Sequence, residues 1–341
     1  MAERSPKSLL VVIPCLNEAR TVASVVERIP RTIPGIRRVD VLVMDDGSTD
    51  DTAEKARAAG AEVVSHRVNQ GLGRTFQEAV GLAVERGVDI MINIDGDGQF
   101  NPQDIPTIVD PIISHNIDMC TASRFADPDL IPRMPGVKKF GNRAVALIVW
   151  MLTGARYADV SCGFRAFSRQ ALLRMNLFGT FTYTQETFLD LAFKGLRITE
   201  IPIEVRGTRE FGTSRMASSI PRYAARSLQI MLRAFISYRP FTFFGAISAV
   251  LFLPGTALLL FLASHYFKTG EFSPHIWAGF VGGSFMFLGA STLILGFIGD
   301  MLVRIRLNQE KILFHLRKST THDRLGFPDT ADTSAPPSGR S

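Results

Sequence analysis

Two long apolar runs near the C-terminus place the strongest constraint on how this chain folds. Residues 241–264 and 276–299 each contain about 24 amino acids without a charged side chain. At about 1.5 Å per residue, a helix of that length spans ~36 Å, enough to cross a ~30 Å hydrocarbon layer with some tilt. Residues 265–275 are too few to form a domain between them. We therefore expect two membrane-spanning helices that form a hairpin, with both outer ends on one side.

Basic residues flank both outer ends of the predicted hairpin. They lie within residues 226–239 before the first helix and within residues 304–318 after the second. Because cytoplasmic flanks of membrane helices carry an excess of Lys and Arg, we expect both termini and the N-terminal domain to be cytoplasmic. Residues 9–13 form an apolar run of about five, too short for the core of a secretory signal.

The net charge of +6 and the isoelectric point near 9.4 indicate an anionic partner. Anionic lipid, phosphorylated substrates and nucleic acid all meet that description. The basic clusters lie beside apolar stretches, which favours a lipid bilayer over nucleic acid as the partner. Cys15, Cys120 and Cys162 are widely spaced and form no metal-type pair, so we expect reduced thiols rather than a zinc site or a disulfide framework.

The N-terminal half alternates short apolar segments with segments of helical periodicity. We expect helices near residues 18–28, 51–59 and 73–86, and strands at residues 9–13, 39–44, 62–65 and 90–94. This alternation predicts an α/β fold with a parallel, doubly wound sheet. Ligands of such sheets bind beyond the carboxyl ends of the strands. Acidic residues occupy those positions here: Asp45 and Asp46 follow the second strand, and Asp95 and Asp97 follow the fourth.

Two further segments combine basic and apolar residues. Residues 138–152 and 214–239 are both expected to be amphipathic helices at the membrane interface, although the second also suits a helix packed on its own domain. The polar end of the chain is expected to be disordered. The predicted organisation is an N-terminal tail (1–7), an α/β domain (8–213), an interfacial helix (214–239), a transmembrane hairpin (240–300), and a basic segment with a disordered tail (301–341).

The first acidic motif combines a turn with two adjacent carboxylates. Asp45-Asp46-Gly47-Ser48 is a good turn sequence, with Ser48 or Asp50 available as a helix N-cap. The turn accounts for Gly47 and one capping residue, but not for two consecutive carboxylates at a strand end. Carboxylates placed there can accept hydrogen bonds from the imino group of a base and from ribose hydroxyls.

The second acidic motif indicates a metal. Asp95 and Asp97 leave a strand one residue apart and project from the same side of an extended backbone. Gly96 and Gly98 permit a tight turn and the close approach of a ligand. Mg²⁺ and Mn²⁺ are commonly held by one or two carboxylates together with substrate phosphates. A calcium-binding loop is the alternative, but the glycine and the distal glutamate of that motif are missing.

The order of these motifs resembles that of glycosyltransferase family 2, whose catalytic domain has the GT-A fold. Four motifs carry the resemblance: Pro14-x-x-Asn17-Glu18, Asp45-Asp46-Gly47-Ser48-x-Asp50-x-Thr52, Asn69-x-Gly71 and Asp95-x-Asp97-x-Gln99. The polyprenyl-phosphate branch, which includes dolichyl-phosphate mannosyltransferases and bactoprenol glucosyltransferases, is similar in three more: Ser123-Arg124-Phe125, Asp159-x-Ser161-x-Gly163-Phe164-Arg165 and Arg209-x-Phe211-Gly212-x-Ser214-Arg215. The resemblance covers roughly residues 8–240, and the two-helix C-terminus is similar to the bactoprenol-type members.

The resemblance implies roles for individual residues. The residues expected to bind the nucleotide-sugar are Pro14, Asn17, Glu18, Asp46, Asp95 and Arg124. The expected metal and pyrophosphate ligands are Asp95, Asp97 and Gln99, with Mg²⁺ or Mn²⁺ as the ion. The acceptor phosphate is expected at Arg143, Arg165, Ser214 and Arg215, and the catalytic group at Asp97, Arg124, Asp159, Glu186 and Arg215.

Several of these residues also have ordinary structural interpretations. Any of the arginines can form a surface salt bridge instead of contacting a phosphate. Asp159 is either a base or a residue that orients Arg165. Glu186 is either an acid near the acceptor or a helix-start acid.

The function implied is that of a membrane-bound, inverting glycosyltransferase. It moves one sugar from a UDP- or GDP-linked donor to a polyprenyl phosphate, and a homo-oligomer remains open. Processive synthases of this family carry Gln-x-x-Arg-Trp, but neither Trp150 nor Trp277 lies in such a motif. The acceptor phosphate is already ionised near neutral pH, so no strong general base is required.

Two other classes of protein are alternatives. A dinucleotide-dependent oxidoreductase would suit the α/β pattern, but the segment that begins Gly71-Leu72-Gly73 lacks the third glycine of the fingerprint. A non-catalytic membrane scaffold or lipid-handling protein would suit the hairpin. A transfer assay separates an enzyme from a scaffold, and a cofactor titration tests the oxidoreductase.

Overall fold

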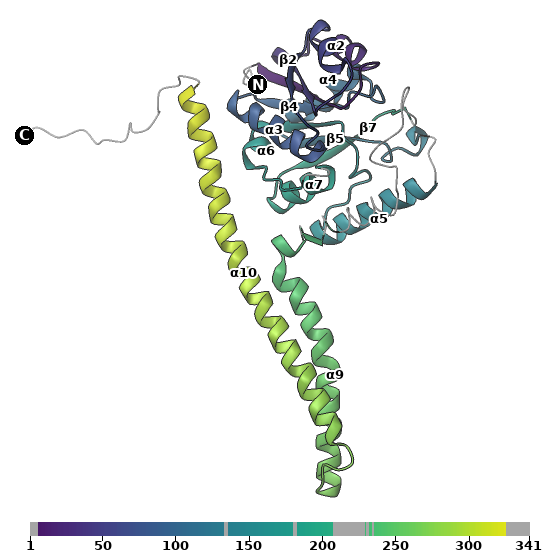
Figure 1. Ribbon diagram of the computed structural model, residues 1–341, viewed down its shortest axis with the longest axis vertical. Helices are drawn as coiled ribbons and strands as arrows, with labels where there is room; N and C mark the ends of the chain where they lie inside the picture. Colours follow the sequence, from purple (N-terminus) through teal and green to yellow (C-terminus); the bar gives the residue numbers. More distant parts are fainter. Residues whose placement is uncertain are drawn as a thin grey trace, which may run out of the picture.

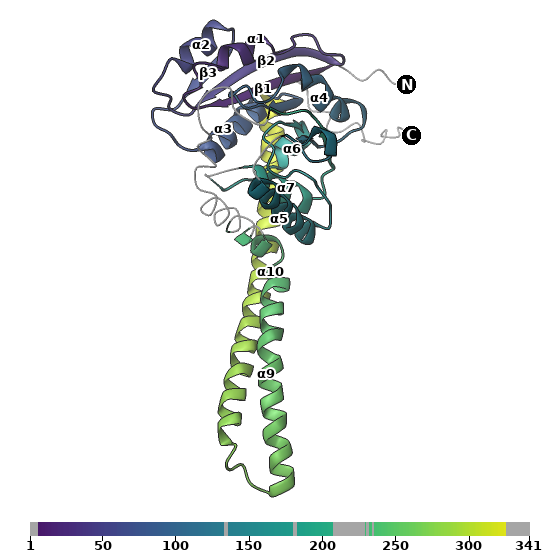
Figure 2. The same cartoon turned by 90° about the vertical axis from the view of Figure 1, so that its right-hand side faces the viewer.

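The structure, a computed structural model, describes residues 6–132, 136–179, 183–206, 229, 232–233 and 235–324. It consists of an α/β domain and a two-helix rod that extends away from it (Figures 1 and 2). The predicted helix at residues 214–239 lies almost entirely outside the described residues. So do Ser214, Arg215 and the rest of their motif.

One seven-stranded sheet forms the centre of the domain, in the order β3-β2-β1-β4-β6-β5-β7. Its strands are β1 (Lys7–Cys15), β2 (Ile36–Asp45), β3 (Glu62–Ser65), β4 (Ile90–Asn93), β5 (Met119–Ser123), β6 (Arg165–Ser168) and β7 (Ile198–Pro202). The first four strands contain or overlap the segments predicted from the sequence. They are all parallel to one another.

The expected parallel arrangement holds for the first four strands, but the sheet also contains an antiparallel strand, β6. This strand runs antiparallel to both β4 and β5, while β5 and β7 are parallel. Because β6 runs opposite to β4 and β5, it begins at the edge of the sheet where those two strands end. The sheet is therefore mixed, and the segment before β6 lies at the carboxyl ends of the parallel strands.

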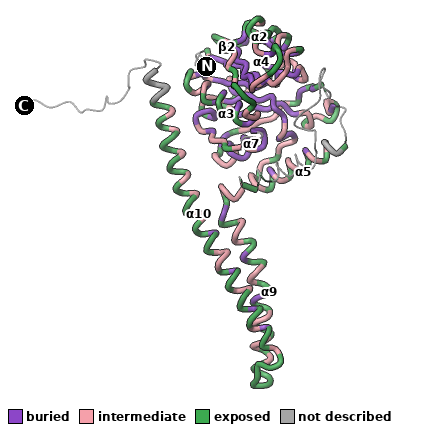
Figure 3. Tube along the Cα trace, in the orientation of Figure 1, coloured by how far each residue is buried: buried purple, intermediate pink, exposed green. Residues whose placement is uncertain are grey.

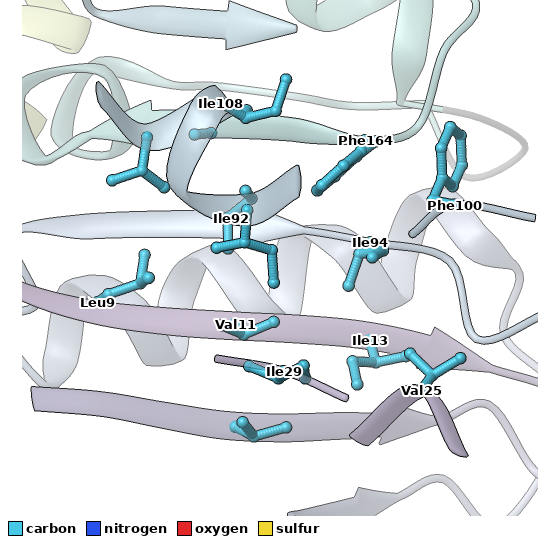
Figure 4. Packing of buried hydrophobic residues seen from close by; sticks show 14 of the residues in the cluster. Leu9, Val11, Ile13, Val25, Ile29, Ile92, Ile94, Phe100, Ile108 and Phe164 are labelled. Atoms are coloured by element: carbon cyan, nitrogen blue, oxygen red, sulfur yellow. The ribbon is translucent and has the colours of Figure 1, made fainter. Parts of the chain in front are cut away.

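Helices cover both faces of the sheet, as a doubly wound fold requires. Alternate residues of β1 point to opposite faces, because side chains alternate along a strand. Leu9, Val11 and Ile13 belong to the core under α1 (Val22–Glu27), α2 (Thr52–Ala58) and α4 (Ile105–Ser114) (Figure 4). Leu10 and Val12 belong to the opposite core under α3 (Leu72–Glu85), α6 (Arg169–Arg174) and α7 (Thr184–Phe193).

The rod is a hairpin of α9 (Pro240–Thr269) and α10 (Ile276–Arg324). Both helices are long and apolar enough to span a membrane, and in each only 11% of the most apolar window is buried (Figure 3). Glycines allow the two backbones to approach closely, as is common between membrane helices. A Cβ on Gly282 would lie 3.1 Å from the carbonyl oxygen of Gly255, and Ser248 donates a hydrogen bond to the carbonyl oxygen of Gly289 at 2.8 Å.

The second hairpin helix is longer than its apolar run. It continues as one helix from Ile276 to Arg324, past residue 299 where the uncharged segment ends. Figure 1 shows this extension running from the rod alongside the domain. There, Arg317 Nη1 donates to the carbonyl oxygens of Leu173 and Met175 at 3.2 and 3.0 Å.

Candidate active site

The acidic motifs meet at one edge of the sheet. In the register of β1 and β2, Cys15 pairs with Asp45, and the backbone N–H of Asp46 donates to the carbonyl oxygen of Cys15 at 2.9 Å. The N–H of Ile94 donates to the carbonyl oxygen of Val12 at 3.0 Å. The two carboxylate pairs therefore lie at the ends of β2 and β4, the strands that flank β1.

The turn after β1 is locked to the turn after β2. Asn17 has a positive φ of 53°, and its side-chain oxygen accepts a hydrogen bond from the N–H of Thr49 at 2.7 Å. The N–H of Asn17 donates to Ser48 Oγ at 2.9 Å, and the N–H of Glu18 donates to Thr52 Oγ1 at 2.8 Å. Pro14, the residue before the last one of β1, is half-buried. The Asp-Asp-Gly-Ser motif thus positions the Asn-Glu motif through side chains on both sides.

Asp46 organises the turn between β3 and α3. Its buried carboxylate accepts hydrogen bonds from the N–H groups of Gln70 and Gly71 at 2.8 and 2.9 Å. It also contacts His66 Nδ1 at 2.8 Å, while His66 Nε2 lies 2.7 Å from Glu78 Oε2. Burial acts to lower the pKa of His66, but the two carboxylates outweigh it and raise that pKa above its ordinary value.

The Asp95 and Asp97 turn is packed tightly against the end of β1. Thr21 Oγ1 donates to the carbonyl oxygen of Gly96 at 2.7 Å, and the buried Asp97 accepts from the N–H of Gln99 at 3.0 Å. A Cβ on Gly96 would lie only 2.5 Å from Cys15 Sγ, so this position requires glycine.

Four carboxylates surround the buried thiol of Cys15. Burial raises its pKa well above the ordinary value, and the negative charges of Glu18, Asp45, Asp95 and Asp97 raise it further. These residues come from three different turns, so the site concentrates negative charge around one point at the sheet edge. A divalent cation would offset that charge.

The residues at this edge suit a metal ion whose remaining ligands come from the substrate. Among residues 6–132 and the other described segments, no group of three or more His, Cys, Asp or Glu side chains is arranged to hold an ion by itself. Mg²⁺ needs no such cage, because it is usually bound by one or two carboxylates with substrate phosphates and water. Asp95 and Asp97 would supply such a pair of oxygen ligands. Gln99 is anchored by its side-chain nitrogen, which donates to the carbonyl oxygen of Arg206 at 3.1 Å.

Gly163 allows the segment before β6 to approach Asp95. A Cβ at this position would lie 3.0 Å from both carboxylate oxygens of Asp95. At the end of β4, Asn93 Nδ2 donates to the carbonyl oxygen of Gly163 at 3.0 Å and to the Tyr183 hydroxyl at 2.8 Å. The close approach fixes one side of Asp95 with backbone rather than with a side chain.

Arg124 and Asp159 form a two-point ion pair at the same edge. Arg124 Nε lies 2.6 Å from Asp159 Oδ2, and Nη2 lies 2.9 Å from Asp159 Oδ1. Asp159 is fully buried, whereas the Arg124 side chain is partly exposed. Burial acts to raise the pKa of Asp159, but the charge and hydrogen bonds of Arg124 outweigh it and hold that pKa below its ordinary value. Asp159 is therefore a carboxylate that orients Arg124.

Further hydrogen bonds connect this pair to α5 (Gly136–Thr153). Ser161 Oγ accepts from Arg124 Nη2 and donates to Asn142 Oδ1, both at 2.9 Å. Asn142 in turn donates to the carbonyl oxygen of Ala158 at 2.8 Å. Arg143, the next residue of α5, has an exposed side chain.

The expectation that Arg165 contacts the acceptor phosphate is wrong. Its guanidinium is fully buried, with Nη1 donating to the carbonyl oxygen of Thr184 at 2.6 Å and Nη2 to that of Val160 at 2.9 Å. It also lies 4.6 Å from the centre of the Phe188 ring. Arg165 opens β6 and points into the core, so it holds α7 and the segment before β6 together.

The carboxylate of Glu186 is hydrogen-bonded to backbone N–H groups of the segment that precedes its helix. Its two carboxylate oxygens accept from the N–H groups of Phe178 and Gly179 at 2.8 and 2.9 Å. Burial raises the pKa of Glu186 although these hydrogen bonds oppose the shift. The contacts correspond to the alternative of a helix-start acid.

Sequence reasoning missed His66, Asn142 and Glu200. The carboxylate of Glu200 accepts from the N–H groups of Ala158 and Asp159 at 2.7 and 2.8 Å, and so fixes the partner of Arg124. Gly163 and Ser161 stood within a quoted motif, so their place near the site was indicated. Nothing in the local pattern pointed to His66, Asn142 or Glu200, because their partners are distant in sequence.

Comparisons with known proteins agree with this geometry. Residues 10–177 match the family model for glycosyl transferase family 2. An uncharacterized protein of Methanocaldococcus jannaschii is 30% identical over segments that cover 68% of this chain and 95% of that protein. The undecaprenyl-phosphate mannosyltransferase of Micrococcus luteus is 27% identical, over 62% of this chain and 88% of that protein. The undecaprenyl-phosphate 4-deoxy-4-formamido-L-arabinose transferase of Pectobacterium atrosepticum is 27% identical, over 88% of this chain and 89% of that protein.

A solved structure supports the fold. Glucosyl-3-phosphoglycerate synthase from Mycobacterium tuberculosis, solved with Mn²⁺, UDP and glucosyl-3-phosphoglycerate, superposes with a TM-score of 0.54 at 23% identity. The match covers 67% of this chain and 80% of that chain. The expected GT-A-like fold is confirmed. The chain belongs to glycosyl transferase family 2.

Proposed function

We propose that this enzyme transfers one sugar, with inversion, from a UDP- or GDP-linked donor to a polyprenyl phosphate held in the bilayer. One observation carries the proposal: Asp95 and Asp97 lie at the same sheet edge as the Arg124–Asp159 pair, in a chain that also carries a hairpin able to span a membrane. Such a site can receive two anionic substrates, one of which is anchored in lipid.

Named relatives support the class of acceptor. The proteins of Micrococcus luteus and Pectobacterium atrosepticum are named for transfer to undecaprenyl phosphate, and the second match extends over most of both chains. The solved neighbour holds Mn²⁺ with UDP, which supports a divalent cation and a nucleoside diphosphate as ligands of this fold.

The mechanism we propose is a direct in-line displacement at the anomeric carbon. An acceptor phosphate oxygen attacks, and the nucleoside diphosphate leaves from the opposite face. Because that oxygen is already ionised, catalysis rests on positioning and on charge stabilisation of the leaving group. A bound Mg²⁺ or Mn²⁺ would neutralise charge on the diphosphate as it departs. Asp95 and Asp97 would hold the ion, and Arg124 would contact a substrate phosphate.

The donor pocket is assigned to the turns after β1 and β2. Pro14, Asn17 and Glu18 are assigned to it by their motif, and Asp46 by its position directly after β2. Arg143 is assigned to the acceptor side, because its exposed side chain follows Asn142, which contacts Ser161 near Arg124. Ser214 and Arg215 are assigned to the acceptor phosphate by their motif alone.

Membrane contact is assigned to the hairpin and to α5. Phe140, Leu147 and Met151 are large apolar residues of α5 that are mostly exposed. They recur at helical spacing and form a stripe suited to the membrane interface. Basic residues beyond the hairpin support a cytoplasmic location for the domain, by the positive-inside rule.

A donor screen tests the proposal. The purified protein is reconstituted in liposomes that contain undecaprenyl phosphate, and radiolabelled UDP- and GDP-sugars are added with Mn²⁺. We expect label from one donor to enter the lipid extract. If every donor leaves the lipid unlabelled while the protein remains folded and inserted, the alternative of a non-catalytic scaffold replaces this proposal.

A further inference from the structure

Five side chains connect the α/β domain to the base of the hairpin, and we call them the α7–α10 network: Asp190, Lys194, Tyr238, Arg306 and Glu310. On the α7 side, Lys194 Nζ lies 2.7 Å from Asp190 Oδ1, and the Tyr238 hydroxyl donates to the same carboxylate. Lys194 Nζ also reaches Glu310 Oε2 on α10 at 3.3 Å.

Arg306 completes the network from α10. Its Nε donates to Glu310 Oε1 at 2.8 Å, and its Nη2 donates to the Tyr238 hydroxyl at 2.9 Å. The guanidinium lies 4.5 Å from the centre of the Tyr238 ring and 5.7 Å from that of Phe178. Two carboxylates and two cations thus balance each other around one hydroxyl group.

The burial of this network distinguishes it from ordinary surface ion pairs. The side chains of Asp190, Lys194 and Glu310 are only 2%, 9% and 14% exposed. Removing charges from water is costly unless each is paired and hydrogen-bonded, so a buried set fixes a specific arrangement. The nearby pair of Arg304 and Asp300 is 80% and 43% exposed, and such pairs contribute little.

The network lies where both hairpin helices meet the domain. Tyr238 precedes the start of α9 at Pro240, and Arg306 follows the end of the uncharged run at residue 299. Both helices are therefore held to α7 at the same level. A membrane anchor that served only as a tether would not require this rigid connection.

The network is also linked to the domain surface near Glu186. Asp190 Oδ2 accepts from the N–H of Asn176 at 3.1 Å, and Glu186 accepts from the N–H groups of Phe178 and Gly179. The ring of Phe178 lies under Arg306. The turn after α6 is thus held between the network and the start of α7.

From this geometry we infer that the α7–α10 network fixes the height and tilt of the α/β domain over the bilayer. It thereby places the sheet edge at the depth of an acceptor phosphate whose isoprenoid chain stays in the lipid. These are positioning residues, since none of them touches the reacting atoms. The inference rests on the proposed function for its acceptor.

Two acceptors separate positioning from catalysis. Tyr238→Phe, Glu310→Gln and Arg306→Gln are compared with wild type in liposomes, using undecaprenyl phosphate in the bilayer or a ten-carbon isoprenyl phosphate supplied from solution. We expect kcat/KM for the bilayer acceptor to fall by about tenfold or more, and that for the soluble acceptor to stay within about twofold. Arg304→Gln, which breaks the exposed pair, should behave as wild type with both.

Equal losses with both acceptors would show that the network supports the catalytic domain itself, and would overturn the inference. Unchanged rates with both would overturn it as well. Tyr238→Phe retains the ring that stacks on Phe193 with 4.5 Å between centroids, so its fold should persist. A wild-type protein inactive with both acceptors would instead contradict the proposed function.

A distance measurement tests the network without any activity. The three native cysteines are buried, so a dye can be attached selectively to Arg57→Cys, an exposed position on α2. Energy transfer to a labelled lipid headgroup then reports the height of the domain. We expect one narrow distance distribution for wild type and Arg304→Gln, and a broader one for Glu310→Gln. Identical distributions would overturn the inference whatever the assay shows.

Discussion

The guanidinium of Arg124 is oriented by a carboxylate that has no exposed surface of its own. Asp159 contacts two of its nitrogens and is itself fixed by Glu200 and by the backbone N–H of Ser161. Because the pKa of Asp159 lies below its ordinary value, this carboxylate stays ionised near neutral pH. Its contacts suit a fixed negative charge that orients Arg124.

Replacing Asp159 with Asn should lower kcat/KM by about 100-fold, because Arg124 loses its orientation. The stabilisation from a carboxylate with a lowered pKa is present above its unfolded pKa of about 3.9 and is lost only as the pH falls through the folded value. The pH profile of the variant between about pH 5.5 and 8 should therefore keep the shape of the wild-type profile. Loss of an acidic limb from that profile would instead identify Asp159 as a base. Ser161→Ala should give a smaller loss, since it removes one hydrogen bond to Arg124 but leaves the ion pair in place.

His66 suits the protonated state, because both ring nitrogens face carboxylate oxygens and only an imidazolium has two N–H donors. A raised pKa means that its stabilisation is complete below the unfolded pKa of about 6.5 and is lost as the pH rises through the higher folded value. His66→Gln should therefore be destabilised by about 1–2 kcal/mol at pH 6, with the difference shrinking by pH 9. Thermal unfolding of wild type and His66→Gln across that pH range measures the difference in stability. A difference that grows with pH would contradict the assignment.

At the scale of elements, the sequence was most informative where structure is local. The first four strands follow from short apolar runs that end in turn residues, and α9 follows from its uncharged length. The direction of β6 could not be read in this way, because it depends on where the preceding segment returns to the sheet. The same is true of α10, whose charged extension is held in place by partners such as Leu173 that are distant in sequence.

Close packing of α9 on α10 gives a prediction with a matched control. A Cβ on Gly282 would lie 3.1 Å from the carbonyl oxygen of Gly255 and from Leu259 Cγ, whereas a Cβ on Gly283 would meet nothing within 4 Å. Gly282→Val should destabilise the hairpin by about 1–3 kcal/mol through overpacking. Gly283→Val should match wild type. Thermal unfolding in detergent compares them, and equal destabilisation of both variants would argue against this helix pairing.

For the whole molecule, the sequence indicated the sheet edge as the site but not the partners within it. Asp46, Asp95 and Asp97 were found because carboxylates followed predicted strands. The pairing of Arg124 with Asp159 spans 35 positions, and the burial of Arg165 depends on the packing of α7. Such contacts arise only when the elements assemble. A motif match therefore located these arginines without distinguishing the exposed one from the structural one.

Metal-assisted transfer to a membrane lipid is the central claim, and the carboxylate of Asp97 tests it most directly. Wild type and Asp97→Ala are reconstituted in liposomes with undecaprenyl phosphate and the active radiolabelled donor, with Mn²⁺ or with a chelator. We predict label in the lipid extract only for wild type with Mn²⁺, and a loss of about 1,000-fold in rate for a variant that unfolds at the wild-type temperature. Near-normal transfer by Asp97→Ala in the presence of the chelator would contradict the account.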